Sequence, residues 1–576
     1  MSYKSKYRDW LLNDYFDEET KEELESIQDN EQEIEDRFYK NLEFGTGGMR
    51  GKMGAGTNRM NKYIVRKATQ GLANYIINYS EDGKENGVVI AYDSRHKSRE
   101  FAEETALVLA GNGIKAYLFS ELRPTPELSF AVRELNAEAG VVVTASHNPP
   151  EYNGYKVYGS DGCQLVPDKA RKVIAEINEL DDFSLIKRMD KSEAEEEGLF
   201  KILGSDMDEK YQEAVIDVLP DVELANKAGN NLKIIYTPLH GTGNKPVRDI
   251  LSTLGFKEMM VVQRQAEPDP DFSTVTSPNP EDRDAYTLAL ELAESYNPDL
   301  IMATDPDADR LGALVKDGEG YTALNGNEIG VLMADYLLSR KKEENLLPDN
   351  PVIIKTIVST EMIRPIADKY NTIVKDVLTG FKYIGEEIKK METTDEEFIL
   401  GFEESFGYLT GTYVRDKDAV NAAALLAMMA LYYQEEREIN LLQRLSELRE
   451  EHGFFLEDLE SMRLEGKEGQ EEIERIIASL REECPAEIAG EDLVVFKDYL
   501  SRISRDLKSG EEREINLPES NVLQFILADE SKITIRPSGT EPKLKFYFAV
   551  RANSEENAKS RLENLKEKFL VMIDKV

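Results

Sequence analysis

Short runs of aliphatic and β-branched residues alternate with segments of helical periodicity along most of the chain. The first series starts at Gly87 and contains the apolar runs VVIAY, IKAYLF and AGVVV. A second series of the same kind begins at Leu232, and a third begins with the helical segment at Gly326. Apolar strands that alternate with crossover helices are typical of α/β domains. We therefore expect three similar α/β units.

The pattern changes after Leu456, where acidic helical sequence is followed by the strand-like runs VLQFILA, KITIRP and KLKFYFAV and by a terminal helix. Short strands joined by tight turns and closed by a helix indicate a smaller α+β domain with an antiparallel sheet. The predicted fold class is therefore α/β, with three similar domains that contain mixed sheets and a smaller α+β domain at the C-terminus. We place the four domains at residues 1–205, 206–324, 325–455 and 456–576.

Each α/β series ends in a strand that leads into a loop of polar residues: TASHNP, DPDADR and GFEES. In open α/β sheets the ligand crevice lies beyond the carboxyl ends of the strands. Three such loops could therefore converge on one central cleft, and we take them as the candidate site.

Composition narrows the class of partner. With 71 Lys and Arg residues against 111 Asp and Glu residues, the formal charge is −40, which argues against nucleic acid and against an anionic membrane surface. Cys163 and Cys484 are too few for a disulfide framework. The N-terminal segment has no apolar core of a secretory signal, and the longest apolar stretch, Ala419–Tyr433, is too short to span a bilayer. We expect a cytoplasmic protein and a buried helix at that stretch.

The first polar loop contains Ser146 directly after the apolar run AGVVV. A strand end in a cleft exposes the serine hydroxyl, and Pro149 and Pro150 stop a helix from covering it. Ser146 is therefore a candidate nucleophile. The alternative for this motif alone is a turn in which the polar side chains cap backbone groups.

The second polar loop carries alternate carboxylates at Asp305, Asp307 and Asp309. Three anionic ligands that lie close together repel one another unless a divalent cation lies among them, and their oxygen atoms suit Mg²⁺. An EF-hand is excluded because Arg310 and Lys316 occupy the positions where that motif has Gly and Glu. The alternative is a solvated turn rich in Asp.

Three further motifs are weaker when each is taken alone. The segment RPSGTEP offers Arg536, Ser538, Gly539 and Thr540 as a cradle for a phosphate, although a hairpin turn is an alternative. The glycine-rich segment around Arg50 departs from a nucleotide-binding P-loop but could line an anion pocket. Acidic residues in GFEESFGY could bind sugar hydroxyls or could simply be surface carboxylates.

Together, and in this order, these motifs resemble the α-D-phosphohexomutase superfamily over nearly the whole chain. The resemblance implies four domains around a central cleft, which bear the phosphoserine, the metal, the sugar contacts and the phosphate contacts in chain order. It also implies one Mg²⁺ per chain and glucose 1,6-bisphosphate as activator and intermediate. The implied catalytic residues are Ser146 as the phosphoserine, His147, Lys156 as a possible general base, and Arg310. The implied metal ligands are Asp305, Asp307, Asp309 and Ser146. The implied substrate contacts are Arg50, Glu403, Ser405, Arg536, Ser538, Gly539 and Thr540.

The length and the motif GFEESFGY look like the longer branch of the superfamily, which contains phosphoglucomutases, phosphopentomutases and sugar-bisphosphate synthases. We expect interconversion of glucose 1-phosphate and glucose 6-phosphate. The expected partner is a small sugar phosphate, with no nucleic acid and no membrane, and the chain is expected to be a monomer or weak homo-oligomer. Phosphomannomutase, phosphopentomutase and hexose-bisphosphate synthase activities remain alternatives. From other classes, a metal-dependent phosphatase or a non-catalytic sugar-phosphate binding protein would share part of the pattern.

Overall fold

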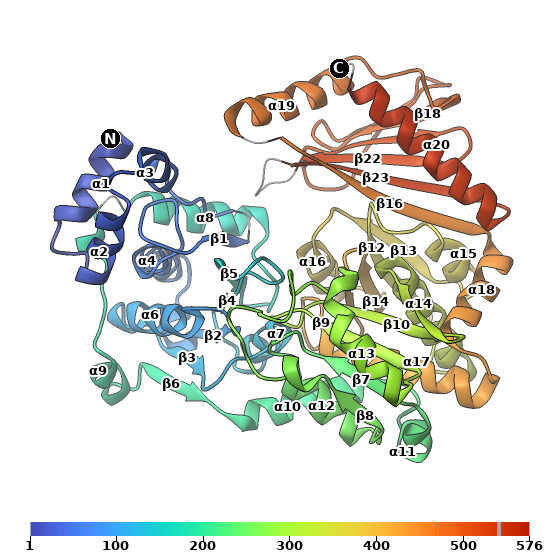
Figure 1. Cartoon of the computed structure of the whole chain (residues 1–576), viewed down its shortest axis with the longest axis horizontal. Coiled ribbons are helices and arrows are strands. Elements are labelled where there is room, and N and C mark those ends of the chain that lie inside the picture. The colour runs from blue at the N-terminus through green and yellow to red at the C-terminus, as the bar shows by residue number, and fades with distance from the viewer. Residues whose placement is uncertain (1, 46, 181, 465, 538–542, 575–576) are drawn as a thin grey trace. The chain divides into compact units, whose positions relative to one another are not determined.

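The computed structural model describes residues 2–45, 47–180, 182–464, 466–537 and 543–574 (Figure 1). It separates into two compact units. Unit 1 comprises Met1–Gly326 and Phe381–Asn440, and unit 2 comprises Asn327–Gly380 and Leu441–Val576. The predicted α/β class with mixed sheets is confirmed. The four predicted domain boundaries stay a prediction, because each unit combines segments from more than one predicted domain.

Unit 1 begins with three short helices that form a small aromatic core. Trp10 stacks on Phe16 with ring centroids 4.2 Å apart, and Tyr63 packs edge-on against both rings. Asp17 and Asn30 cap the second and third helices by accepting hydrogen bonds from backbone N–H groups. The helices are α1 (Tyr3–Leu12), α2 (Glu18–Ser26) and α3 (Glu31–Phe38).

The first sheet of unit 1 has six strands, in the order β1-β5-β4-β2-β3-β6. Four of the strands are parallel, whereas β5 runs antiparallel to β4 because the chain reverses direction just after Ser146. The strands are β1 (Gly48–Lys52), β2 (Val88–Tyr92), β3 (Ala116–Phe119), β4 (Ala139–Val143), β5 (Tyr152–Gly159) and β6 (Phe200–Leu203). The helices are α4 (Lys62–Tyr79), α5 (Gly83–Asn86), α6 (Ser98–Gly111), α7 (Thr125–Glu134), α8 (Pro167–Asn178) and α9 (Lys191–Glu196).

The second sheet of unit 1 has five strands, in the order β11-β10-β9-β7-β8. Its strand β9 is fully buried and pairs in parallel with β7 and antiparallel with β10. The strands are β7 (Ile234–Thr237), β8 (Met259–Val261), β9 (Leu300–Thr304), β10 (Leu311–Asp317) and β11 (Gly320–Leu324). The helices are α10 (Ser205–Asp217), α11 (Val222–Ala228), α12 (Asn244–Thr253) and α13 (Thr287–Tyr296).

Unit 1 is completed by a hairpin between two helices. The elements are α16 (Phe381–Met391), β14 (Glu397–Glu403), β15 (Gly407–Leu409) and α17 (Ala419–Arg437). Most side chains of α17 are buried, which confirms the buried helix that the apolar stretch predicts. Within the described ranges, no helix is both long enough and apolar enough to cross a membrane.

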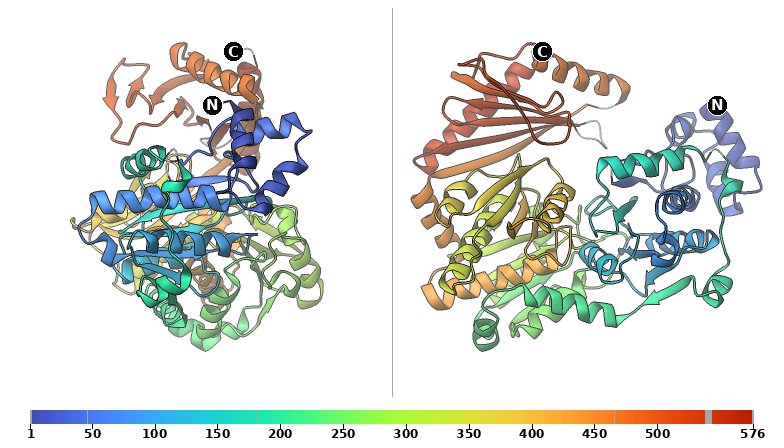
Figure 2. Two further views of the ribbon diagram at one scale, coloured as in Figure 1. Left: turned by 90° about the vertical axis from the view of Figure 1, so that its left-hand side faces the viewer. Right: turned by 180° about the vertical axis from the view of Figure 1, so that it is seen from behind.

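Unit 2 contains a large antiparallel sheet, with strands in the order β16-β23-β22-β21-β18-β19-β20 and with β17 beside β18. The long helix α20 lies across one face of this sheet, where Phe569 packs against Phe546 and Phe548 (Figure 2). The strands are β16 (Phe454–Arg463), β17 (Glu487–Ile488), β18 (Glu491–Asp498), β19 (Ile503–Asp506), β20 (Glu512–Glu514), β21 (Leu523–Leu527), β22 (Lys532–Pro537) and β23 (Lys543–Ala552). The helices are α19 (Gly466–Glu482) and α20 (Glu555–Ile573). This arrangement confirms the predicted antiparallel C-terminal sheet.

The remaining elements of unit 2 are three helices and a parallel pair of strands. They are α14 (Gly326–Glu343), β12 (Pro351–Thr356), α15 (Ile363–Asp368), β13 (Ile373–Val377) and α18 (Leu441–His452). A buried ion pair joins two of the helices: the guanidinium of Arg444 donates to both carboxylate oxygens of Asp335, at 2.9 Å each.

The start of α17 depends on one buried carboxylate. Asp418 accepts the backbone N–H groups of Val420 and Asn421, at 2.9 Å each, and the hydroxyls of Tyr211 and Tyr413 at 2.9 and 2.7 Å. The carboxylate therefore caps the helix and anchors it to α10.

We predict that Asp418→Ala lowers the free energy of unfolding by about 2 kcal/mol, because the substitution removes a helix cap and leaves buried donors without acceptors. Urea denaturation followed by circular dichroism measures this loss. Asp349→Ala changes an exposed loop residue and serves as the control. Equal unfolding midpoints for the two variants would contradict the role of the cap.

Candidate active site

Two loops that the sequence singled out meet in unit 1. The hydroxyl Oγ of Ser146, which follows β4, donates a hydrogen bond of 2.7 Å to Oδ2 of Asp305, which follows β9. Both side chains are buried. The candidate nucleophile therefore lies against the candidate metal site, although 159 residues separate the two along the chain.

The backbone at Ser146 adopts a left-handed conformation, with φ of 51°. This conformation is costly for a residue with a side chain and persists only where the surroundings fix it. The N–H of Ser146 donates to Oγ1 of Thr144 at 2.8 Å, and that hydroxyl donates to Oδ2 of Asp93 at 2.6 Å. The conformation directs the serine hydroxyl away from its own strand and toward Asp305.

His147 is the second hydrogen-bonding neighbour of the serine hydroxyl. Its Nδ1 lies 3.1 Å from Oγ of Ser146. Burial, and then the positive charges of Arg310 and Arg50, hold the pKa of His147 well below its usual value. The imidazole is therefore neutral near pH 7 and can accept a proton from the serine.

Arg95 fixes the serine loop, and the sequence analysis did not identify it. The guanidinium forms a fully buried ion pair with Asp93 at 3.2 Å. It also donates to carbonyl oxygens of the loop, which are those of Ser146, Asn148, Pro149 and Tyr152. Its position in the sequence could have identified it. Arg95 closely follows β2, and the parallel strands β2 and β4 place their carboxyl ends side by side.

The carboxylates of Asp305, Asp307 and Asp309 offer one ligand atom each, and these atoms lie within 4.8 Å of one another. All three side chains are buried. Oδ1 of Asp305 accepts the N–H groups of Asp309 and Arg310, at 3.0 Å each, which holds the loop in a tight turn. Ala308 takes a left-handed φ of 49° within this turn.

Two ammonium groups partly balance the carboxylates. Nζ of Lys156 on β5 lies 2.7 Å from Oδ2 of Asp307, and Nζ of Lys417 lies 2.9 Å from Oδ2 of Asp309. Although burial alone would lower them, the carboxylates raise the pKa values of both lysines. Burial, and then the neighbouring carboxylates, raise the pKa of Asp305 well above its usual value. Although burial alone would raise it, the charge of Lys156 holds the pKa of the neighbouring Asp307 below its usual value.

The carboxylates also keep oxygen atoms available for a cation. Oδ1 of Asp307 and Oδ1 of Asp309 are buried and accept no hydrogen bond from any described residue. Buried acceptors are nearly always satisfied in proteins, and an all-oxygen set of carboxylates suits a hard divalent cation. Asp305, Asp307 and Asp309 thus fit the metal site that the sequence predicted.

The third loop lies at the end of β14 and carries Glu403, which is buried. Burial, and then the charge of Glu404, raise the pKa of Glu403 to about 7. At Gly407, an added Cβ would approach Cδ of Lys417 to 2.6 Å and Cγ of Glu403 to 3.0 Å. A side chain at this position would therefore crowd both Lys417 and Glu403.

Backbone hydrogen bonds connect this loop to the loop that carries Asp305, Asp307 and Asp309. The N–H of Leu311 donates to the carbonyl of Phe406 at 3.0 Å, and the N–H of Ala419 donates to the carbonyl of Ala308 at 3.2 Å. Arg310 forms an ion pair with Glu281 at 2.5 Å. The loop at residues 305–310, the turn at residues 403–407 and the start of α17 therefore form one connected structure.

The remaining candidate residues lie in different places. Arg50 on β1 donates from Nη1 to Oδ1 of Asn148 at 2.9 Å, so it adjoins the serine loop. Ser405 lies in the turn between β14 and β15 and is partly exposed. Arg536 lies near the C-terminal end of β22 in unit 2, whereas the other described candidates belong to unit 1. Ser538, Gly539 and Thr540 lie outside the described residues.

Three successive segments of the chain match the phosphoglucomutase/phosphomannomutase family. Its alpha/beta/alpha domain I matches residues 41–183, domain II matches residues 209–318, and domain III matches residues 325–452.

Individual relatives agree with this match. The chain is 39% identical over 541 residues to a phosphoglucomutase of Staphylococcus epidermidis, covering 94% of each chain. It is 39% identical over 536 residues to a phosphoglucomutase of Staphylococcus haemolyticus, covering 92% of this chain and 94% of the relative.

Solved structures extend the likeness to the fold. A putative phosphomannomutase from Thermus thermophilus matches with a TM-score of 0.68 and 20% identity, covering 93% of this chain and 99% of the other. A phosphoglucomutase from Paramecium, parafusin, matches with a TM-score of 0.69 and 16% identity, covering 93% and 95%. With three matched domains and relatives that are similar over most of their length, the chain belongs to the phosphoglucomutase/phosphomannomutase family.

Proposed function

We propose that this chain is a phosphoglucomutase, an isomerase that interconverts glucose 1-phosphate and glucose 6-phosphate through a phosphorylated Ser146. The observation that carries the proposal is the contact between Ser146 and Asp305 inside a buried carboxylate cluster with unused oxygen atoms. The Staphylococcus relatives named phosphoglucomutase support the choice of reaction.

In the proposed mechanism, the bond between phosphorus and Oγ of phospho-Ser146 breaks while phosphorus bonds to the oxygen of the free hydroxyl of the bound sugar phosphate. That hydroxyl gives up its proton, and Oγ of Ser146 takes one up. Asp305, Asp307 and Asp309 would hold Mg²⁺, which would supply positive charge for the transferring phosphoryl group. Ser146 gains a proton when its phosphoryl group leaves and loses it when a phosphoryl group returns. His147 and Asp305 lie within hydrogen-bonding distance of Oγ and can exchange this proton. Lys156, whose pKa Asp307 and Asp309 raise despite burial, acts here as a cation beside the phosphoryl group rather than as a base.

The first transfer produces glucose 1,6-bisphosphate, which must turn end for end before the other phosphate returns to Ser146. Glu403 and Ser405 are the proposed contacts to the sugar hydroxyls. Arg50 would contact the substrate beside the serine loop. Arg536, with Ser538, Gly539 and Thr540, would hold the phosphate that is not being transferred in either orientation. The same bisphosphate would act as the activator that phosphorylates Ser146 in resting enzyme.

The test is turnover of glucose 1-phosphate by the purified chain with Mg²⁺ and a trace of glucose 1,6-bisphosphate, beside mannose 1-phosphate and ribose 1-phosphate. Fast formation of glucose 6-phosphate with slow reaction of the other two sugars supports the proposal. Preference for mannose 1-phosphate or ribose 1-phosphate would replace the substrate but keep the chemistry. Net release of inorganic phosphate without isomer would overturn the reaction type.

We predict that Ser146→Ala and Ser146→Gly each lower kcat by at least about 1000-fold, because both remove the hydroxyl that carries the phosphoryl group. The glycine variant tolerates the left-handed backbone and separates loss of the nucleophile from strain. Intact-mass measurement should show no phosphorylated protein for either variant. Ser160→Ala alters an exposed serine and should retain full activity.

We predict that Asp307→Asn weakens Mg²⁺ binding more than about tenfold, because it removes a charged ligand from the cluster. Titration calorimetry with Mg²⁺ alone measures this affinity without turnover. Chelation of Mg²⁺ should abolish wild-type activity, and added Mg²⁺ should restore it. Asp282→Asn, at an exposed position, is the matched control, and equal affinities for the two variants would argue against the site.

We predict that Arg95→Lys lowers kcat by about tenfold to 100-fold with little change in KM, because a lysine cannot replace the planar fork that holds the serine loop. Steady-state kinetics with glucose 1-phosphate separates the two constants. Arg99→Lys, four residues along and exposed, should leave both unchanged. A rise in KM alone would instead place Arg95 in substrate binding.

A further inference from the structure

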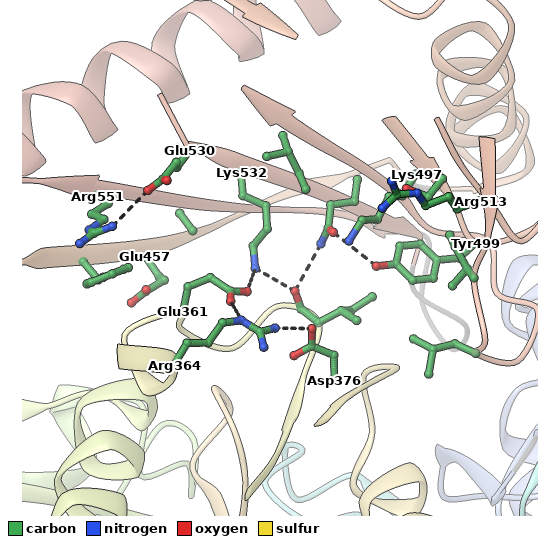
Figure 3. Close-up of a pocket in the computed structure, with 18 of the residues that line it drawn as sticks. Glu361, Arg364, Asp376, Glu457, Lys497, Tyr499, Arg513, Glu530, Lys532 and Arg551 are labelled. Atoms are coloured by element: carbon green, nitrogen blue, oxygen red, sulfur yellow. Dashed lines mark hydrogen bonds and ion pairs between the residues drawn. The ribbon is translucent and has the colours of Figure 1, made fainter. Parts of the chain in front are cut away.

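Unit 2 contains a cavity of about 850 Å³ that none of the proposed catalytic steps uses (Figure 3). One wall is the face of the antiparallel sheet formed by β18, β21, β22 and β23, and the other runs from Ile357 through α15 to Asp376. Cavities of this volume are typical of sites for small molecules.

The two walls are joined by buried polar contacts. Nζ of Lys532 on β22 lies 2.8 Å from Oε1 of Glu361 and donates to the carbonyl of Ile357 at 3.1 Å. Nε2 of Gln524 on β21 donates to the same carbonyl at 3.3 Å. These bonds give the cavity a defined floor.

The floor is lined by charged side chains of both signs. Arg364 pairs with Glu361 at 2.6 Å and with Asp376 at 2.5 Å, and the fully buried Lys355 pairs with the same two carboxylates at 3.1 and 3.0 Å. With Lys532 and Glu457, three cations and three carboxylates gather at this floor. Their charges therefore balance one another.

Lys497 on β18 adds a fourth cation. Its side chain lines the cavity beside Tyr499 (Figure 3). Its Nζ forms no hydrogen bond or ion pair with any described residue. Burial lowers the pKa of Lys497, and Asp376 and Glu361 only partly oppose this effect. Lys497 is only partly buried, and a bound anion would supply the partner that its ammonium group lacks among the described residues.

The cations at the cavity mouth are already paired, in contrast to Lys497. Arg513 donates to both carboxylate oxygens of Glu511 at 3.0 Å, and Arg551 pairs with Glu530 at 3.2 Å. Much of the remaining lining is apolar. It includes Ile357, Pro365, Phe455, Ile515, Leu517 and Ile526.

We propose that this cavity binds a small organic anion, with its phosphate or carboxylate group on Lys497 and its apolar body against the aliphatic and aromatic lining. The site shares no residue with the proposed catalytic set. Strand β22 nevertheless connects the two, because Lys532 in the cavity floor and Arg536 belong to the same strand. A ligand that ties the sheet to the segment Ile357–Asp376 would restrain that strand, and it would therefore slow the mutase reaction. This last consequence depends on the proposed function.

Titration calorimetry on the intact chain tests the site without turnover, so its result does not depend on the mutase assignment. The probes are phenyl phosphate, benzoate and uncharged phenol, which share an aromatic body and differ in the head group. We expect phenyl phosphate or benzoate to bind and Lys497→Met to weaken that binding at least about tenfold, because the variant removes the charged partner. Binding of phenyl phosphate alone identifies the phosphate class, and binding of benzoate alone identifies the carboxylate class.

Two variants control for misfolding and for nonspecific attraction. Lys497→Arg keeps the positive charge and should bind within about threefold of wild type. Lys508→Met removes an exposed lysine in the turn between β19 and β20 and should have no effect. Equal affinity of wild type and Lys497→Met, equal binding of phenol, or no binding of any probe would overturn the proposal.

A second measurement tests the regulatory consequence. The probe that binds should lower kcat for glucose 1-phosphate in wild type at saturating substrate, and it should have at least about tenfold less effect at the same concentration on Lys497→Met. Inhibition that added substrate relieves completely, in both proteins, would place the probe in the active site and overturn the regulatory consequence.

Discussion

Three carboxylates must lie together in the interior of unit 1, and their mutual repulsion sets the arrangement around them. Two like charges 4 Å apart repel by about 4 kcal/mol at the effective dielectric of a partly screened site. Lys156, from the strand that follows the serine loop, and Lys417, from the segment before α17, approach this cluster from different parts of the chain. The serine hydroxyl contributes a further donor. The cluster thereby holds together segments that the sheets alone would not bring to one point.

Backbone strain accompanies this arrangement. Ser146, Ala308 and Phe406, one in each of the three loops, adopt left-handed φ angles without being glycine. Such conformations cost on the order of 1–3 kcal/mol each and require support from their surroundings. Buried bonds supply that support: Arg95 holds the carbonyls of the first loop, and backbone hydrogen bonds link the other two. Contacts within the chain therefore hold these three loops in place, which favours catalysis by positioned groups.

The parts of the fold and of the candidate site that follow a simple physical pattern could be predicted from the sequence. Strands β4 and β9 are continuous apolar runs that end abruptly in polar loops, so both the strands and the candidate residues Ser146 and Asp305 stand out. Arg95 and Lys417 do not stand out, because each lies in a short charged segment that resembles a solvated turn. Their partners are carbonyls and carboxylates that only the tertiary structure brings near. The phosphate loop after Arg536 stays a prediction, since Ser538, Gly539 and Thr540 lie outside the described residues.

The crowding at Gly407 bears on how the sugar preference of this family can change. A side chain there would crowd both Lys417, which pairs with Asp309, and Glu403, so a change at this position would disturb the proposed metal ligands together with the proposed sugar contact. Ser405 lies in the same turn and is partly exposed to solvent. Libraries that aim to redirect the enzyme to another sugar should therefore vary Ser405 and keep Gly407 constant.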